Sequence, residues 1–318
     1  MRLDRILAIG LIFVCLIAAL GNWLGSDAPR VETAGKGVGP IVGASDIALI
    51  EIYGLISDEA TTGPFAGANR SNSNTIVKIC RQARKDGVKA ILLQINSPGG
   101  TLAASQTVYD ELMRIRQETD IKIVANLGDV AASGGYYIAS AADHIVANPG
   151  TLTGSIGVII QTQNISDLFD KIGVQTNTIQ SGQYKDILSP FRGRTEDEQA
   201  LLQEIVAQSY QQFLDAIVAG RGIAMEALRP LADGRIFTGE QALEVQLVDS
   251  LGNTYDAIQK AAELANIEGE PSVRNYSSIT SLRQSLGIFL SSSLEHLIPY
   301  YQEVKITRWN NIPLALRR

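Results

Sequence analysis

Short apolar segments alternate with helix-like segments through most of this 318-residue chain, and this alternation constrains the fold more than any other feature. Strands are expected where β-branched and other apolar residues cluster between turn signals. Helical patterns lie between these clusters, for example from Thr101 to Gln117. Such alternation is typical of an α/β fold with a parallel-rich sheet covered by helices. The expected strands are Ile47–Tyr53, Val88–Ile95, Ile121–Leu127, Ile156–Ile160 and Val174–Ile179.

Two threonines provide helix-start signals. Thr195-Glu-Asp-Glu198 has the capping-box pattern, and we expect it to open a long helix that runs to about Val218. Thr238-Gly-Glu-Gln241 repeats the pattern and predicts a shorter helix.

The N-terminus carries a candidate membrane segment. Arg2 and Arg5 precede an uncharged apolar stretch from Ile6 to Leu20, which can be extended through Leu24. This length approaches the ~20 residues that a helix needs to cross a bilayer. The two arginines favour a cytoplasmic N-terminus and an exported remainder. A cleaved secretory signal is the alternative, because small residues lie near the end of the stretch.

These features divide the chain into four parts. Residues 1–25 are expected to form a membrane anchor or signal sequence, and residues 26–45, rich in Gly, Pro and small polar residues, a flexible linker. Residues 46–265 are the expected catalytic domain, and residues 266–318 a helical tail. Apolar residues recur at helical spacing between Ile279 and Tyr301, which favours packing against the protein itself or a neighbouring subunit.

Composition excludes several classes of partner and cofactor. The formal charge of −6 and the pI near 5.1 provide no basic field for nucleic acid. Cys15 and Cys80 are the two cysteines, and their placement in the first apolar segment and in a predicted helix indicates neither a disulfide nor a metal site. We expect no cofactor.

A glycine-flanked serine is the strongest candidate for chemistry. Ser133 lies in Gly128-Asp-Val-Ala-Ala-Ser-Gly-Gly-Tyr-Tyr137, at the turn between an expected strand and an expected helix. There its hydroxyl would meet the positive end of the helix dipole, and the Gly134 N–H could bind a developing oxyanion. A simple helix-capping serine is the alternative interpretation.

The base that a serine nucleophile needs is not an obvious histidine. His144 and His296 are the two histidines, and His144 lies at the start of an expected buried strand. Burial disfavours the charged form of a lysine, so a lysine can replace histidine as the base. Lys185, in Ser181-Gly-Gln-Tyr-Lys185, is the candidate, and a solvated loop lysine is the alternative.

A second glycine pair follows another expected strand. In Asn96-Ser-Pro-Gly-Gly100, proline and glycine allow a turn that points a backbone N–H into a site. An ordinary tight loop would also explain this motif.

With these motifs, and with Thr153-Gly-Ser-Ile-Gly-Val158, the sequence resembles the signal peptide peptidase A family of serine proteases over residues 46–265. The resemblance implies a crotonase-like fold of repeated ββα units, similar to that of the caseinolytic protease. It implies that Ser133 is the nucleophile and Lys185 the general base. It also implies an oxyanion hole formed by the N–H groups of Gly100 and Gly134, and a role for Ser155 in holding the lysine amine.

The resemblance also implies a substrate and an assembly. We expect an endopeptidase anchored by one span in a prokaryotic-type plasma (inner) membrane, which cleaves apolar peptides, such as signal-peptide remnants, on the extracytoplasmic side. Each motif occurs once, whereas longer family members carry two repeats. A homo-oligomeric ring or dome with shared active sites is therefore expected. A non-catalytic membrane scaffold and a crotonase-like acyl-transfer enzyme are the alternatives.

Overall fold

The computed structural model describes residues 45–59 and 70–277. The expected membrane segment, nearly all of the linker and the apolar part of the C-terminal tail lie outside these ranges. Among the helices that the structure describes, none has the length and apolar character needed to cross a membrane.

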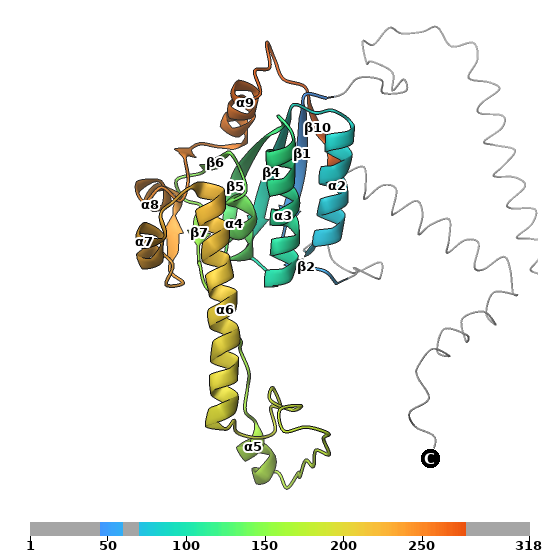
Figure 1. Cartoon of the computed structure of the whole chain (residues 1–318), viewed down its shortest axis with the longest axis vertical. Helices are drawn as coiled ribbons and strands as arrows, with labels where there is room; N and C mark the ends of the chain where they lie inside the picture. Colours follow the sequence, from blue (N-terminus) through green and yellow to red (C-terminus); the bar gives the residue numbers. More distant parts are fainter. Residues whose placement is uncertain (1–44, 60–69, 278–318) are drawn as a thin grey trace, which may run out of the picture. The chain divides into compact units, whose positions relative to one another are not determined.

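A mostly parallel sheet forms the centre of the structure, as the sequence predicts (Figure 1). Its main path runs β10-β1-β4-β5-β6-β9, and every neighbouring pair on this path is parallel. The strands of this path are β1 (Ile47–Tyr53), β4 (Ala90–Ser97), β5 (Lys122–Ala132), β6 (His144–Ala147), β9 (Ser250–Leu251) and β10 (Val273–Asn275). Strand β1 has the predicted bounds.

Four strands of three residues each complete the sheets. Strand β7 (Leu152–Gly154) pairs in parallel with the end of β5, and β8 (Ile236–Thr238) pairs with β7 in the antiparallel direction. Strands β2 (Leu55–Ser57) and β3 (Arg70–Asn72) form a separate two-stranded sheet.

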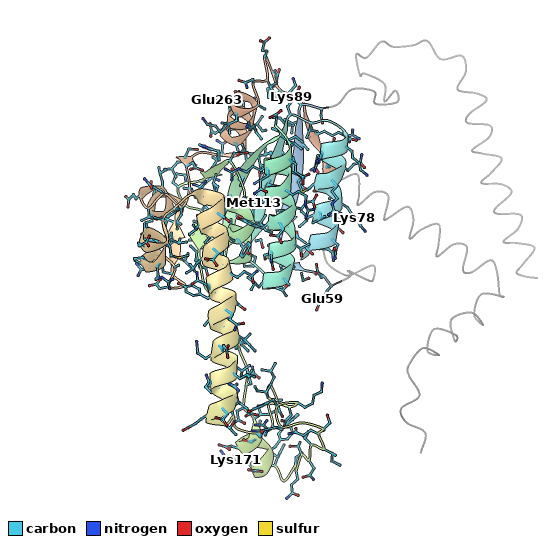
Figure 2. The ribbon with its side chains drawn as sticks, viewed as in Figure 1. Glu59, Lys78, Lys89, Met113, Lys171 and Glu263 are labelled. Atoms are coloured by element: carbon cyan, nitrogen blue, oxygen red, sulfur yellow. The ribbon has the colours of Figure 1, made fainter. Side chains whose placement is uncertain are left out.

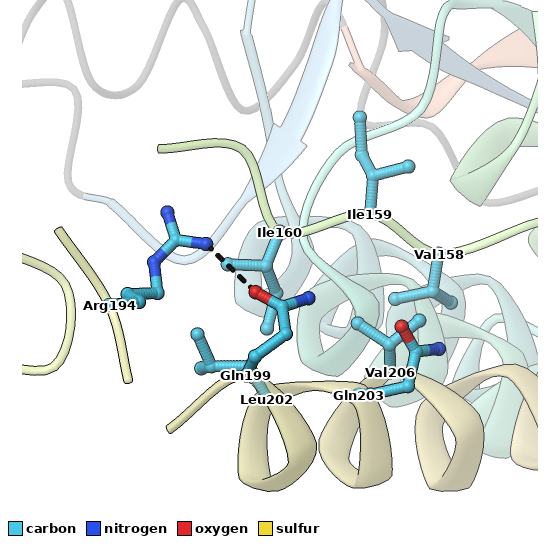
Figure 3. A pocket seen from close by; sticks show the side chains of 8 residues that line it. All are labelled: Val158, Ile159, Ile160, Arg194, Gln199, Leu202, Gln203 and Val206. Carbon is cyan, nitrogen blue, oxygen red and sulfur yellow. Dashed lines mark hydrogen bonds between the residues drawn. The ribbon is translucent and has the colours of Figure 1, made fainter. Parts of the chain in front are cut away.

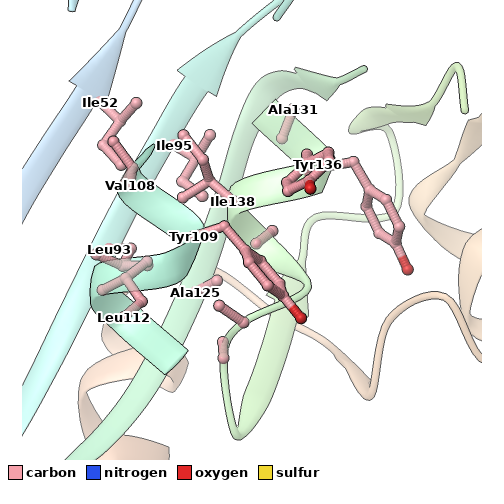
Figure 4. Packing of buried hydrophobic residues seen from close by; sticks show 14 of the residues in the cluster. Ile52, Leu93, Ile95, Val108, Tyr109, Leu112, Ala125, Ala131, Tyr136 and Ile138 are labelled. Atoms are coloured by element: carbon pink, nitrogen blue, oxygen red, sulfur yellow. The ribbon is translucent and has the colours of Figure 1, made fainter. Parts of the chain in front are cut away.

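Helices cover both faces of the main sheet. On one face lie α2 (Ser73–Lys85), α3 (Leu102–Glu118) and α4 (Gly134–Ala139), and Figure 4 shows side chains of α3 and α4 packed on β4 and β5. On the other face lies α9 (Thr254–Leu264), whose alanines pack on Ile47, Leu92 and Val124. Because both faces are buried, the central strands are apolar almost throughout, as expected for a parallel sheet.

The long helix α6 (Glu196–Arg221) belongs to this core only at its C-terminal end. Phe213, Leu214 and Ile217 are buried there, and the Phe213 ring lies 4.8 Å from the Tyr137 ring of α4. Its N-terminus has the predicted capping box: the Glu198 N–H donates to Thr195 Oγ1 at 3.2 Å, and the Thr195 N–H donates to Glu198 Oε2 at 2.9 Å.

The remaining helices lie beyond α6 along the chain. The short α7 (Met225–Leu228) continues into a 3₁₀ turn (Arg229–Leu231). The second predicted capping box, at Thr238, is also confirmed and opens α8 (Gly239–Glu244).

The segment between β7 and the buried end of α6 forms a separate structural feature. This segment, residues 157–212, is called the arm here, and the remaining described residues are called the body. The arm contains α5 (Ser166–Lys171), which has no buried residue, and the first part of α6, where only Glu198 and Leu202 are buried. Figure 1 shows α5 at the end of α6 that lies away from the sheet.

Two sequence predictions in the arm are wrong. Residues 156–160 and 174–179 form no strand, although their apolar patterns predict one. A strand needs a neighbouring strand to bind its backbone groups; apart from Ile156, which is buried in the core, both segments run through the arm away from the sheet. Ile159 is 83% exposed and Ile179 is fully exposed, so their apolar side chains have no cover within the described chain.

Candidate active site

Ser133 occupies a strained turn between β5 and α4. Its φ and ψ are 52° and −120°, a conformation that costs a non-glycine residue on the order of 1–3 kcal/mol. The backbone on both sides holds it: the Ser133 N–H donates to Gly154 O at 2.8 Å, and Ser133 O accepts from the Tyr137 N–H at 2.9 Å. The side chain makes no helix-capping hydrogen bond, so the helix-cap interpretation does not hold. The half-buried hydroxyl thus faces no partner among the described residues.

The Gly99–Gly100 turn packs directly against this serine. A Cβ on Gly99, whose φ is 108°, would lie 2.8 Å from Gly134 N and 2.9 Å from Ser133 Cβ. A Cβ on Gly134 would lie 3.1 Å from Gly100 N and would collide with the Ser105 hydroxyl. Only glycine permits this approach of the two turns.

Hydrogen bonds fix the glycine turn to strand β2. The Ile56 N–H donates to Gly99 O at 2.9 Å, and the Thr101 N–H donates to Ile56 O at 2.9 Å. This pattern leaves the Gly100 N–H without an acceptor in the described part of the chain. The Gly134 N–H, at the first position of α4, is one of the donors that a helix cannot satisfy internally. Two unpaired N–H groups therefore lie beside Ser133, an arrangement that can stabilise an oxyanion.

Ser155 lies next to Ser133 across a strand pair. Strand β7 pairs with β5 so that Gly154 is opposite Ala132, and each serine follows one of these residues. Ser155 also has a left-handed φ, of 50°, and its N–H donates to Arg235 O at 2.8 Å. The structure thus brings together four of the five predicted site residues: Ser133, Ser155, Gly100 and Gly134.

Lys185 is the residue that the chain does not bring to this site. It is exposed in the arm, where its N–H donates to Gly182 O at 3.1 Å. The neighbouring Asp186 is joined through Arg192 to Glu198, in the first turn of α6. The helix rise of 1.5 Å per residue places Glu198 roughly 22 Å along the axis from Phe213, which packs on α4. Figure 2 shows Lys171 of α5 correspondingly far from Met113 of the body.

A groove lined by both apolar and polar side chains lies along the arm. Figure 3 shows Val158 and Ile160 pointing toward α6, which contributes Leu202 and Val206, whereas the Ile159 side chain points away from the helix; a hydrogen bond of 3.3 Å joins Arg194 to Gln199. The groove encloses about 340 Å³. The two halves of the arm are therefore incompletely packed against each other.

Comparison with known proteins identifies the family. The model of Peptidase family S49 matches residues 115–268, a range that includes Ser133, Ser155 and Lys185. A Synechocystis protein named as a protease is 45% identical over 207 residues, which cover 65% of this chain and 73% of that protein. This chain belongs to peptidase family S49. The S49 assignment makes it a serine protease and confirms the resemblance to the signal peptide peptidase A family.

Two further relatives of this S49 chain differ in length. An Enterococcus faecium protein named as a signal peptide peptidase SppA is 35% identical over 267 residues, 83% of this chain and 75% of that protein. Protease 4 of Salmonella typhi is 34% identical over 263 residues, 80% of this chain but 41% of that protein. The S49 chain therefore corresponds to less than half of the longer relative.

Other reactive side chains of the S49 chain have structural surroundings. His144 Nε2 lies 2.9 Å from the Ser250 hydroxyl at the β6–β9 edge, and burial lowers the pKa of this histidine. Cys80 is buried in α2, and burial raises the pKa of its thiol to about 12. His296 lies outside the described residues. Within residues 45–59 and 70–277, no cluster of three or more His, Cys, Asp or Glu side chains could hold a metal ion.

Sequence reasoning missed two residues that shape this region. Buried Ser97 donates to Gly54 O at 2.6 Å and accepts from the Gly99 N–H at 3.1 Å, so it orders the glycine turn. The position of Ser97 inside the motif Asn96-Ser-Pro-Gly-Gly100 was the sequence signal that could have indicated this role. Arg192 joins two carboxylates in the arm, and no local sequence pattern indicates that contact.

Proposed function

We propose that this S49 peptidase is a membrane-anchored endopeptidase that degrades apolar peptides, remnant signal peptides in particular, outside the cytoplasm. The name of the Enterococcus relative supports the substrate class, and the apolar segment from Ile6 to Leu20 supports the anchor in a prokaryotic-type plasma membrane. The parallel sheet with its strand–helix units supports a crotonase-like fold.

One observation carries the chemistry: the strained turn presents the Ser133 hydroxyl beside two unpaired glycine N–H groups. Ser133 Oγ attacks the peptide carbonyl carbon while a neutral Lys185 Nζ accepts the hydroxyl proton. The carbonyl oxygen becomes an oxyanion that accepts hydrogen bonds from the Gly100 and Gly134 N–H groups. Ser155 holds the lysine amine in position.

Collapse of this intermediate breaks the C–N bond. The protonated lysine gives its proton to the leaving amine, and an ester between Ser133 and the peptide acyl group remains. Water then attacks the ester with Lys185 again as the base. The oxyanion again accepts hydrogen bonds from the two glycine N–H groups, and its collapse, with transfer of the proton from Lys185 to Ser133 Oγ, releases the peptide acid and restores the serine hydroxyl.

The position of Lys185 supports an active site shared between subunits. Because Lys185 lies in the arm, next to the Asp186 that Arg192 joins to the first turn of α6, and away from the body that holds its own Ser133, we assign the base of each site to the arm of a neighbouring copy, in a ring or dome. The exposed apolar side chains of the arm favour such an assembly, since a second copy would bury them and remove water from the lysine. These side chains are Ile159, Ile160, Leu168, Ile172, Val174, Ile179, Tyr184, Leu188, Phe191, Leu201 and Ile205.

Labelling by a serine-reactive phosphonate probe tests the chemistry. The intact protein should become labelled and should cleave apolar peptides from a library, as read by mass spectrometry. Ser133→Ala should lose both activities, and the control Ser166→Ala, in the arm, should keep both. An unlabelled intact protein favours a scaffold. Labelling with hydrolysis of acyl thioesters but of no peptide favours an acyl-transfer enzyme.

A further inference from the structure

Arg192 joins the lysine loop to the long helix of the arm. Its Nε and Nη2 donate to the two oxygens of Asp186, at 2.8 and 2.6 Å. Its Nη1 and Nη2 donate to the two oxygens of Glu198, at 2.9 and 2.5 Å. One guanidinium therefore makes paired contacts with two carboxylates, and we call these three residues the Arg192 clamp.

The clamp is well sheltered at its carboxylates. The Glu198 side chain is 3% exposed and that of Asp186 14%. Hydrogen bonds from Arg192 lower the pKa of Glu198 to about 2 and also lower the pKa of Asp186. The Thr195 N–H also donates to Glu198. With its side-chain amide oriented so that the nitrogen faces Asp186, Gln180 donates to the carboxylate of Asp186. The planar fork of arginine suits such paired contacts, and lysine cannot reproduce them.

The loop that carries Lys185 has few other attachments. Asp186 is the next residue along the chain, and the segment 172–195 contains no buried residue. The end of the arm away from the body, residues 165–195, is called the arm tip here. Two contacts that do not involve Arg192 join its beginning to residues 190–191: the Ile165 N–H donates to Pro190 O at 2.7 Å, and the Phe169 and Phe191 rings lie 5.2 Å apart. Loss of the Arg192 clamp should therefore free the residues around Lys185 from α6, while the Ile165–Pro190 and Phe169–Phe191 contacts still hold the arm tip together.

We propose that Arg192 is a positioning residue for Lys185, because it fixes Asp186, and with it the lysine backbone, to the first turn of α6. This role rests on the proposed function of Lys185 as the base. Phe213 and Ile217 pack helix α6 into the core of the body. Because the clamp joins Asp186 to the first turn of this helix, it fixes the position of Lys185 relative to the body. The oxyanion hole and the strained serine do not depend on it.

Steady-state kinetics of the full-length protein on an apolar peptide test the role. Arg192→Gln should lower kcat roughly 10- to 100-fold, the cost of a small misplacement of a reacting group, with little change in KM. The kcat of Arg192→Lys should lie between that of Arg192→Gln and that of the wild type. Asp186→Asn should also lower kcat. The matched control is Arg194→Gln, which removes the same charge two residues away, where Arg194 makes one hydrogen bond to Gln199 and no ion pair with any described residue. Equal losses in both arginine variants would overturn the role.

A double-mutant cycle separates positioning from a general structural effect. If Arg192 acts through the lysine, Arg192→Gln should cause no further loss in the Lys185→Ala background, measured as the residual rate of labelling by the phosphonate probe. A further loss of the same size overturns the positioning role and leaves the proposed function intact. Near-normal turnover in Lys185→Ala alone overturns the proposed base and, with it, this role of Arg192.

Discussion

The turn around Ser133 and the loop around Lys185 are built in opposite ways. The serine turn stands on the ends of buried parallel strands, where Gly99, Gly134 and Ser155 are held by backbone hydrogen bonds and close packing. The lysine loop lies in the arm, where it is attached by the ion pairs of Arg192, one backbone hydrogen bond from Ile165 to Pro190 and one aromatic pair. One copy of the chain therefore assembles the proposed nucleophile and the proposed oxyanion hole, whereas the proposed base, Lys185, is exposed within one copy.

This difference explains how strain is tolerated in the serine turn. Left-handed φ values at Ser133 and Ser155 cost free energy that a buried core can offset. Large apolar side chains surround the turn, including Tyr136 and Ile138 of α4, and each such core side chain typically contributes about 2–5 kcal/mol relative to alanine. The arm has no comparable core, so we expect its geometry to depend on assembly.

The largest effect should come from adding one methyl group to the body. Gly134→Ala would place a Cβ against the Ser105 hydroxyl and 3.1 Å from Gly100 N. We expect peptide cleavage and probe labelling to fall by at least about 100-fold, as for loss of one oxyanion donor. The matched change in the arm is Gly182→Ala, where nothing lies within 4 Å of the new Cβ. Similar activity in the two variants would contradict the conclusion that the serine turn is closely packed and the lysine loop is not.

Polar substitution on the arm should disrupt assembly and activity together. Ile159→Ser combined with Ile179→Ser removes two highly exposed apolar side chains. We expect a smaller assembly in sedimentation and loss of activity in proportion, with thermal unfolding of the body nearly unchanged because neither side chain contributes to its core. The control is Ile236→Ser, an exposed isoleucine of the body at 59% exposure. Full activity from dissociated double-mutant protein would refute the dependence of the lysine on a neighbour.

Ser155 should have an intermediate effect, because it lies where the two regions would meet. Ser155→Ala leaves the serine turn and both glycine N–H groups in place but removes the hydroxyl proposed to hold the lysine amine. We expect kcat to fall roughly 10-fold with little change in KM. Unchanged kinetics would return Ser155 to the role of a strained turn residue.

The smallest effect should be a loosening of the arm in acid. A carboxyl group with a lowered pKa stabilises the folded state above its unfolded pKa, about 4.3 for Glu. This stabilisation is lost as the pH falls through the folded value, which is about 2 for Glu198. Hydrogen exchange at the arm tip should therefore accelerate between about pH 4 and pH 2, before exchange in the body does. Glu198→Gln retains a capping-box residue but lacks the charge, so its arm should exchange faster at neutral pH and depend less on pH across this range.

The sequence predicted the body better than the arm for a physical reason. Strand β1 and the Thr238 capping box are local patterns in the body, and both are confirmed. The expected strands at residues 156–160 and 174–179 are wrong. An apolar pattern indicates that side chains favour burial, but it does not indicate which surface buries them. The approach of Gly99 to Gly134 needed the paired strands, and the Arg192 clamp joins groups whose contact depends on how the arm folds back on α6.

The most direct test of a shared site is complementation between two inactive chains. Ser133→Ala and Lys185→Ala proteins are co-expressed with different tags, and mixed oligomers are purified through both tags in succession. If each site combines the serine of one copy with the lysine of its neighbour, some interfaces pair two intact residues, and the mixed oligomers should regain part of the peptide cleavage that neither variant shows alone. If both residues came from one chain, every site would carry one defect, and verified mixed oligomers would stay inactive.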